Sequence, residues 1–253
     1  MHWQWRSPVG QLKDMAARTL LVKLDQRKLI DLPPRRQTPT NRMRSGLEST
    51  VKVEPPACPI ECSLSELGTI TVSEVSAHAT DRAWVKAALQ QFHYLGFSGT
   101  VGENLQYLVR DGQGRALACL VFGAAAWKCQ DRDRWIGWSI DARRRHLPLL
   151  ANNQRFLIMP WTRVAHLASW TLGQVMQRLS ADWHRKYGHR LALVETFVEQ
   201  PRFAGTAYRV ANWVKVGRTT GRTRQDATRS IQTPAKDVYL YLLRRDFREM
   251  LHA

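Results

Sequence analysis

The chain has 253 residues, of which 38 are lysine or arginine and 21 are aspartate or glutamate, so its formal net charge is +17. A chain of this length can bury a sizeable core, and 44% hydrophobic residues is ordinary for a globular protein. The basic excess favours a polyanionic partner such as nucleic acid. A membrane surface is the weaker alternative, because the basic residues are spread along the chain and no lipid-anchor motif is present.

The common targeting and metal-binding motifs are missing from the sequence. Residues 1–10 lack the apolar core of a signal peptide, and the longest apolar run, Leu117–Trp127, is too short to span a bilayer. The four cysteines are too few for a disulfide framework, and Cys58 and Cys62 have no second pair of zinc ligands at the usual spacing. We therefore expect a cytoplasmic protein with reduced thiols.

The first part of the chain predicts a small helical segment followed by a linker. Apolar residues recur at roughly helical spacing over 11–31, and Pro33 and Pro34 would end the helix. Residues 1–34 therefore form either part of a helix-turn-helix-like module or a surface helix packed on the main domain. Residues 35–70 begin with a stretch rich in proline, arginine, threonine and serine, which is typical of a basic linker.

Residues 71–253 predict a core domain in which strands alternate with helices. The strongest element is an amphipathic helix over 167–187 that ends at Gly188. Helices are also expected at 81–92, near 208–213 and before His252, and strands at 106–110, 116–124, 156–160, 191–194 and 237–243. This order predicts an α/β (α+β) fold with a mixed central sheet flanked by helices.

A group of polar residues follows the predicted strand 191–194, and sites in α/β folds are often built at strand ends. Glu195, together with Asp133 and Asp182, would supply the carboxylates that hold Mg²⁺ or Mn²⁺ for phosphoryl transfer. Tyr208 would instead act as a nucleophile that forms a covalent phosphotyrosine. The structural alternative is that Glu195 pairs with Arg209 or Arg155 inside an ion-pair network.

Basic and aromatic residues predict a surface that contacts phosphates and bases. Arginines clamp phosphates and tryptophans stack on bases, although interleaved arginine and tryptophan suit a packed ion-pair network nearly as well. The candidates are Arg143, Arg144, Arg145, Arg155, Arg202, Arg218, Arg222, Arg224, Trp138, Trp213 and His93.

The order of elements from residue 71 onward resembles the GNAT (N-acetyltransferase) fold. In that family a glycine-containing loop before the long helix binds the cofactor pyrophosphate, and a tyrosine near the end acts as general acid. Here residues 164–169 contain no glycine, and Trp213 stands nearest to the tyrosine position. The resemblance therefore implies a GNAT-like layout without acetyl-CoA binding.

Several segments are similar to the DruA family, named for the Druantia anti-phage defence system and also found among transposon-associated proteins. They are HYLG (93–96), RDRWIGW (132–138), NNQRFLIMPW (152–161), HLAS (166–169), ADW (181–183), ETFVE (195–199) and FAGTAYRVANWVKVGRTTGR (203–222), with a matching segment before residue 36. The resemblance implies a role in phage defence or in mobile-element DNA transactions.

Three functions follow as hypotheses. The first is a DNA-binding enzyme, nuclease-like or transposase-like, that acts on strands through a metal or a tyrosine. The second is a non-catalytic recognition subunit that recruits other defence or transposition proteins. The third is a degenerate N-acyltransferase. The expected partners are DNA and such proteins, with a homo-oligomer left open.

Overall fold

The computed structural model describes residues 20–21, 24–25, 27–33, 51–221 and 234–252. The chain divides into two units, Met1–Gly46 and Leu47–Ala253. In the first unit Leu20–Leu21 and Leu24–Asp25 are helical, and the Leu32 amide donates to Asp25 Oδ1 at 3.0 Å. The rest of the helix predicted over 11–31 lies outside the described residues.

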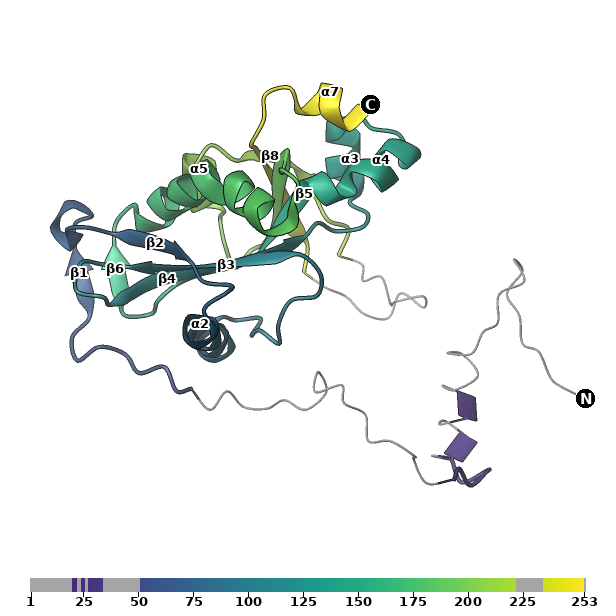
Figure 1. Ribbon diagram of the computed structural model, residues 1–253, viewed down its shortest axis with the longest axis horizontal. Helices are drawn as coiled ribbons and strands as arrows, with labels where there is room; N and C mark the ends of the chain where they lie inside the picture. The colour runs from purple at the N-terminus through teal and green to yellow at the C-terminus, as the bar shows by residue number, and fades with distance from the viewer. Residues whose placement is uncertain (1–19, 22–23, 26, 34–50, 222–233, 253) are drawn as a thin grey trace, which may run out of the picture. The chain divides into compact units, whose positions relative to one another are not determined.

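Within the described residues of the second unit, seven strands form one mixed sheet (Figure 1). Its order is β2-β3-β4-β5-β7-β9-β8. The strands span Thr71–Glu74 (β2), Asn104–Arg110 (β3), Ala116–Ala124 (β4), Leu150–Ile158 (β5), Leu193–Glu199 (β7), Val214–Arg218 (β8) and Lys236–Leu242 (β9). All neighbours pair antiparallel except β5 and β7, which pair parallel. The predicted α/β class is confirmed.

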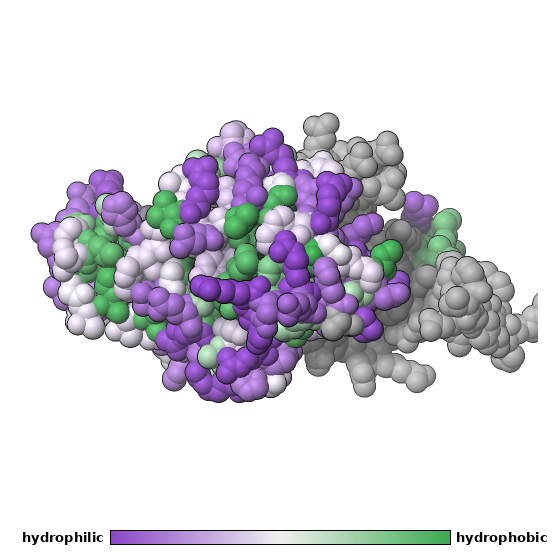
Figure 2. Space-filling model, turned by 90° about the horizontal axis from the view of Figure 1, so that it is seen from above, coloured by the Kyte–Doolittle hydropathy of each residue, from purple (hydrophilic) through white to green (hydrophobic). Residues whose placement is uncertain are grey.

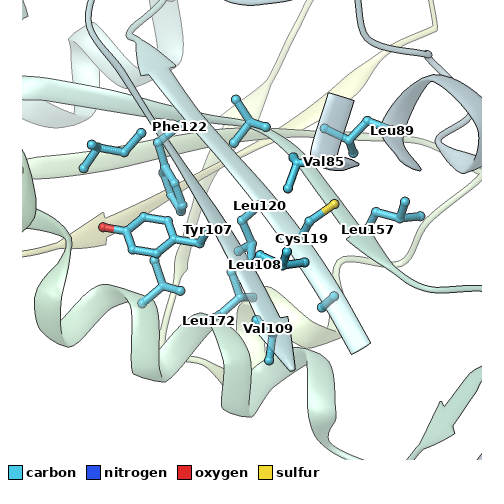
Figure 3. Close-up of a cluster of buried hydrophobic side chains, with 14 of the residues drawn as sticks. Val85, Leu89, Tyr107, Leu108, Val109, Cys119, Leu120, Phe122, Leu157 and Leu172 are labelled. Carbon is cyan, nitrogen blue, oxygen red and sulfur yellow. The ribbon is translucent and has the colours of Figure 1, made fainter. Parts of the chain in front are cut away.

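Helices cover both faces of this sheet. In Figure 1 α5 (Leu167–Tyr187) lies above the strands and α2 (Ala79–Phe92) lies below them. Successive strand residues point to opposite faces, so Tyr107 and Val109 of β3 face α5 whereas Leu108 faces α2 (Figure 3). This alternation gives each helix its own layer of the main hydrophobic core.

A second, smaller core lies under three short helices: α3 (Gln130–Ile136), α4 (Ile140–His146) and α7 (Phe247–His252). Trp135 of α3 stacks on Phe247 of α7, with ring centroids 5.4 Å apart. Buried Leu150 and Leu193, at the starts of β5 and β7, complete this core. The helices therefore fix the end of the sheet at which the two parallel strands begin.

The parallel pair β5–β7 is joined only at that end. Leu150, Ala151 and Asn152 pair with Leu193, Val194 and Glu195, and the ladder stops there. Beyond it β5 remains bonded to β4 and β7 remains bonded to β9. Because each strand stays with its outer neighbour, the two strands separate and leave a gap in the middle of the sheet.

The linker predicted over 35–70 includes residues that pack in the core of the second unit, and residues 35–50 lie outside the described residues. Val53, Ile60 and Leu67 are buried in the core of the second unit. Strand β1 (Ile60–Cys62) pairs parallel with β6 (Thr162–Val164), and a 3-10 turn, η1, covers Ser65–Leu67. This pairing joins residues about a hundred positions apart, so the local sequence carries no sign of it.

The predicted order of helices and strands is confirmed, with additions. Helix α5 has the predicted bounds and ends at Gly188, whose positive φ of 81° suits glycine. Helices α3 and α4 and strands β1, β2, β6 and β8 were not predicted. Strand β5 begins earlier than expected, and β7 ends later. Short elements η2 (Leu147–Leu149) and α6 (Thr206–Val210) complete the described fold. No helix among the described residues is long and apolar enough to cross a membrane.

Candidate functional site

The gap between β5 and β7 opens into a cavity of about 650 Å³. Five parts of the chain line it: the end of α2 with the residues after it, the second half of β5 with Pro160, the start of α5, the second half of β7, and α6 with the loop before it. Most of the segments quoted above for the DruA resemblance meet here, namely 93–96, 152–161, 166–169, 195–199 and 203–222. A concave site with aromatic walls and few polar groups is typical of ligand binding.

The polar floor of the cavity is built around Asn153. Its Nδ2 donates to Val121 O and to Arg155 O at 3.3 and 3.1 Å, which fixes the amide orientation. Its Oδ1 therefore accepts the Tyr208 hydroxyl at 2.7 Å. Burial raises the pKa of Tyr208 to about 12, so the phenol stays neutral and acts as a hydrogen-bond donor.

Gln154 occupies a β-bulge on the cavity wall. Arg155 pairs with Val121 and Asn153 with Phe122, so Gln154 is the extra residue. Its side chain lies against Gly123, where a Cβ would overlap the carboxamide. Among the residues that the structure describes, the Gln154 carboxamide has no hydrogen-bond partner. The bulge thus presents an amide with free donor and acceptor to the cavity.

The mouth of the cavity combines aromatic rings with charged groups. Tyr94 contacts Phe203 at a centroid distance of 5.3 Å, and the Arg202 guanidinium lies 4.7 Å from the Tyr94 ring centre. Arg202 also pairs with Glu199 at 3.5 Å. His93 stacks on Tyr94, and burial, together with Arg155, lowers the pKa of His93 to about 4. His93 is therefore neutral near pH 7, and its Nδ1 accepts the Leu95 amide.

Glu195 lies outside this cavity, in a closed charge cluster. Its Oε2 accepts Arg132 Nη1 at 2.8 Å, and both side chains are 0% exposed. Its Oε1 accepts the Ala126 amide at 2.6 Å. Asp133 binds the same guanidinium at 2.7 Å and also accepts from Trp138 and Arg143. The structural pairing considered for Glu195 is therefore present, but its partner is Arg132.

Asp182 belongs to a third environment, between α5 and β3. Its carboxylate accepts from Tyr107 at 2.9 Å, from Arg178 at 2.6 Å and from Arg185 at 2.6 Å. Burial alone would raise the pKa of Asp182, but the hydrogen bonds from Arg178 and Tyr107 lower it overall. The structure thus does not bring Asp182 together with Glu195 and Asp133.

The described residues contain no group of three histidine, cysteine, aspartate or glutamate side chains that could hold a metal ion. The geometry therefore does not support the proposed ligand set for Mg²⁺ or Mn²⁺, and a metal role stays a prediction. A nucleophilic role for Tyr208 stays a prediction too. Its raised pKa opposes it, because the phenolate is the attacking form.

The predicted nucleic-acid contacts separate into two groups. Trp138 and Trp213 are 9% and 3% exposed, and Arg143 is tied to Asp133, so these three side chains belong to the interior. The remaining described candidates lie at the surface or beside the cavity: Arg144, Arg145, Arg155, Arg202, Arg218 and His93. Arg222 and Arg224 lie outside the described residues.

A comparison with protein families covers the segments that meet at the cavity. Residues 23–236 match the family described as Druantia protein DruA. The chain belongs to the DruA family. Because the match spans most of the chain, it includes every segment that lines the cavity. No match was found among curated proteins.

Solved structures similar to this DruA-family chain include two structures of spermidine N-acetyltransferase from Vibrio cholerae. The spermidine/spermine N-acetyltransferase SpeG is 10% identical, with 70% of this chain and 94% of that chain covered and a TM-score of 0.40. The spermidine N-acetyltransferase in complex with CoA and spermine is 11% identical, with 69% and 95% covered and a TM-score of 0.44. Similarities this distant carry no argument about activity.

The cavity residues Asn153, Gln154 and Thr196 were not among the predicted site residues. A signal for them was present, because Asn152-Asn153-Gln154 is a polar run directly before an apolar strand segment. Its polar side chains need partners or ligands inside a sheet. Thr196 carries a weaker signal, since a threonine after an acid is common in ordinary strands.

Proposed function

We propose that this DruA-family chain is a nucleic-acid recognition protein of anti-phage defence. Family membership associates it with anti-phage defence, and DNA binding is our own step beyond that. The single observation that carries the step is the distribution of charge. Asp182, Glu195 and Asp237 are buried and tied into ion pairs, whereas exposed arginines remain at the surface of a chain of net charge +17. Hydrophilic residues cover much of the face shown in Figure 2.

Two stretches of exposed arginine are candidates for phosphate contacts. Arg202 and Arg209 lie beside the cavity, on the loop before α6 and on α6 itself. Arg144 and Arg145 project from α4, while Arg143 of the same run turns inward to Asp133. Guanidinium groups in such positions bind phosphate oxygens and release condensed counterions.

Recognition without strand cleavage agrees best with the geometry of the acids. A two-metal reaction needs carboxylates with free oxygens beside the scissile phosphate. Glu195 and Asp182 instead accept hydrogen bonds at both oxygens from groups within the fold. We therefore place the chain as the recognition subunit, with partner proteins supplying other activities.

The test is salt-dependent binding of labelled DNA, measured by fluorescence anisotropy with and without Mg²⁺ or Mn²⁺. We expect tight binding at low salt that weakens steeply as NaCl rises, and intact strands on a denaturing gel. Combined Arg202→Gln and Arg209→Gln substitutions should lower the magnitude of the log–log salt slope by about 1.4 for single strands or about 1.8 for duplex, if each arginine neutralises one phosphate.

The matched control is Arg163→Gln, because Arg163 is an exposed, ion-paired arginine on β6 that does not line the cavity. It should leave the slope unchanged. Absence of DNA binding at moderate salt would overturn the proposal. Metal-dependent cleavage that is lost in Glu195→Gln would replace it with the nuclease hypothesis.

A further inference from the structure

The cavity between β5 and β7 has walls suited to a flat ring. Tyr94 and Phe203 contact each other at its mouth, although 37% and 45% of their surfaces remain exposed. Deeper in the cavity Phe156 meets Tyr208 edge to face, with centroids 6.4 Å apart. Aromatic side chains offer planar faces on which another ring can stack. Two such pairs at different depths favour a planar ligand over an extended aliphatic one.

One polar side chain of the cavity lining has no hydrogen-bond partner among the described residues, so it can pair with the edge of such a ring. Asn153 and Tyr208 satisfy each other, and the Thr196 hydroxyl donates to Asn153 O at 3.1 Å. The Gln154 carboxamide, by contrast, has no partner among the described residues, and Gly123 leaves the space that it occupies. A carboxamide offers a donor beside an acceptor, the pattern that pairs with the edge of a nucleobase.

The charge at the mouth suits a ring that carries a phosphate. Arg202 is 54% exposed and lies over Tyr94, so its guanidinium can reach a ligand stacked at the mouth. Arg209 on α6 is also exposed, and one of its nitrogens donates to the Thr206 hydroxyl. A volume of about 650 Å³ is large enough for a base with its sugar.

We infer that this cavity binds one nucleobase, stacked on its aromatic walls and read by Gln154. The choice of ligand rests on the proposed function, since a strand held by the basic surface would present its bases to the mouth. The base comes either from an unstacked position in a nucleic-acid strand or from a free nucleotide. Both sources share the planar ring and the phosphate, and the experiment separates them.

The first arm titrates the full chain with AMP, CMP, GMP and TMP by isothermal calorimetry. The second arm measures anisotropy with single strands of about 12 nucleotides, within the range of one binding module. One strand carries all its bases and the other has abasic sites at its centre. We expect the abasic strand to bind about 5- to 150-fold more weakly, the range for one stacked base.

Two variants with a control tie this difference to the cavity. Ala204 is exposed and lines the mouth, so Ala204→Trp should block entry without disturbing the core. It should remove the difference between the two strands and leave the salt slope unchanged. Gln154→Ala should reduce the preference among the four bases while stacking persists. Ala77→Trp is the control, because Ala77 is exposed before α2, at the opposite end from the cavity.

The outcomes separate this inference from the proposed function. If both strands bind equally well and no mononucleotide binds, the cavity assignment is overturned and DNA recognition stands. Mononucleotide binding that Ala204→Trp blocks, without strand binding, supports the cavity assignment and overturns DNA recognition. A base-dependent difference that persists in a folded Ala204→Trp variant places the base elsewhere and overturns the inference.

Discussion

Glu195 and Thr196 are neighbours on β7, yet they belong to two different polar sites. Successive side chains of a strand point to opposite faces, so Glu195 enters the closed cluster with Arg132 while Thr196 faces the open cavity. The closed cluster uses both carboxylate oxygens of Glu195 within the protein. The open cavity leaves the Gln154 carboxamide without a hydrogen-bond partner among the described residues, and it leaves Tyr94 and Phe203 partly exposed.

This difference separates a structural role from a binding role. A buried carboxylate with all its hydrogen bonds satisfied has nothing left to offer a ligand, however suggestive its position at a strand end. An amide without a protein partner beside exposed rings has that capacity. The two sites share the strands β5 and β7, so substitutions can test them separately in one protein. We expect the closed cluster to control stability and the open cavity to control binding.

The largest effect is expected from breaking the closed cluster. Arg132→Met leaves Glu195 as an uncompensated charge in the interior and should lower the free energy of unfolding by about 3–5 kcal/mol. Urea denaturation followed by circular dichroism measures it. Adding Glu195→Leu should recover part of the loss, because the buried charge is then gone. If the double variant is no more stable than Arg132→Met, the pairing does not explain the loss.

A smaller, pH-dependent effect is expected at Asp182. The pKa of Asp182 in the folded state lies below its ordinary value. The stability that the ionised carboxylate contributes is therefore complete above the ordinary pKa and is lost as the pH falls through the folded-state pKa. Asp182→Asn should cost about 2 kcal/mol at neutral pH, through weaker hydrogen bonds with its partners. The deficit should shrink in acid, below about pH 4. Exposed Asp141→Asn is the control, and a deficit independent of pH would contradict the prediction.

Tyr208→Phe tests the floor of the cavity. Loss of one hydrogen bond to Asn153 should cost about 1 kcal/mol near neutral pH. Folding favours the protonated phenol, whose pKa is about 12, so wild-type stability should fall as pH rises from the unfolded value near 10 towards that value. The variant should lose less stability over this alkaline range. Equal alkaline losses in both proteins would show that Tyr208 does not titrate as described.

The regular elements were predictable where local pattern and caps agree. Helix α5 carries its apolar residues at helical spacing and ends at a left-handed glycine, so the helix and its C-terminal end follow from the sequence. Strand β8 was missed because it is an edge strand whose burial does not alternate: Val214 and Lys215 are both exposed, and the register shifts between Lys215 and Gly217. It is a strand because it pairs with β9, which lies later in the chain, so the local sequence pattern does not reveal the pairing.

The site was less predictable than the fold. Arg132 lies 63 positions before Glu195, so no local pattern reveals that the two side chains meet. The cavity likewise depends on where the β5–β7 ladder stops, which is decided by the second core and by the outer strands. The polar run Asn152–Gln154 was the available local signal. That run does not by itself predict a binding site, because the β-bulge that leaves Gln154 outside the ladder is visible only in the structure.

The smallest stability effect, and the sharpest separation of the two sites, is expected from Gly123→Ala. The added methyl meets only the end of the flexible Gln154 side chain, which can move aside, so the free energy of unfolding should change by less than about 1 kcal/mol. Displacing that carboxamide should nevertheless reduce the preference among mononucleotides, measured by calorimetry. Unchanged preference in a stable variant would show that Gln154 does not read the base, and stacking alone would then account for binding.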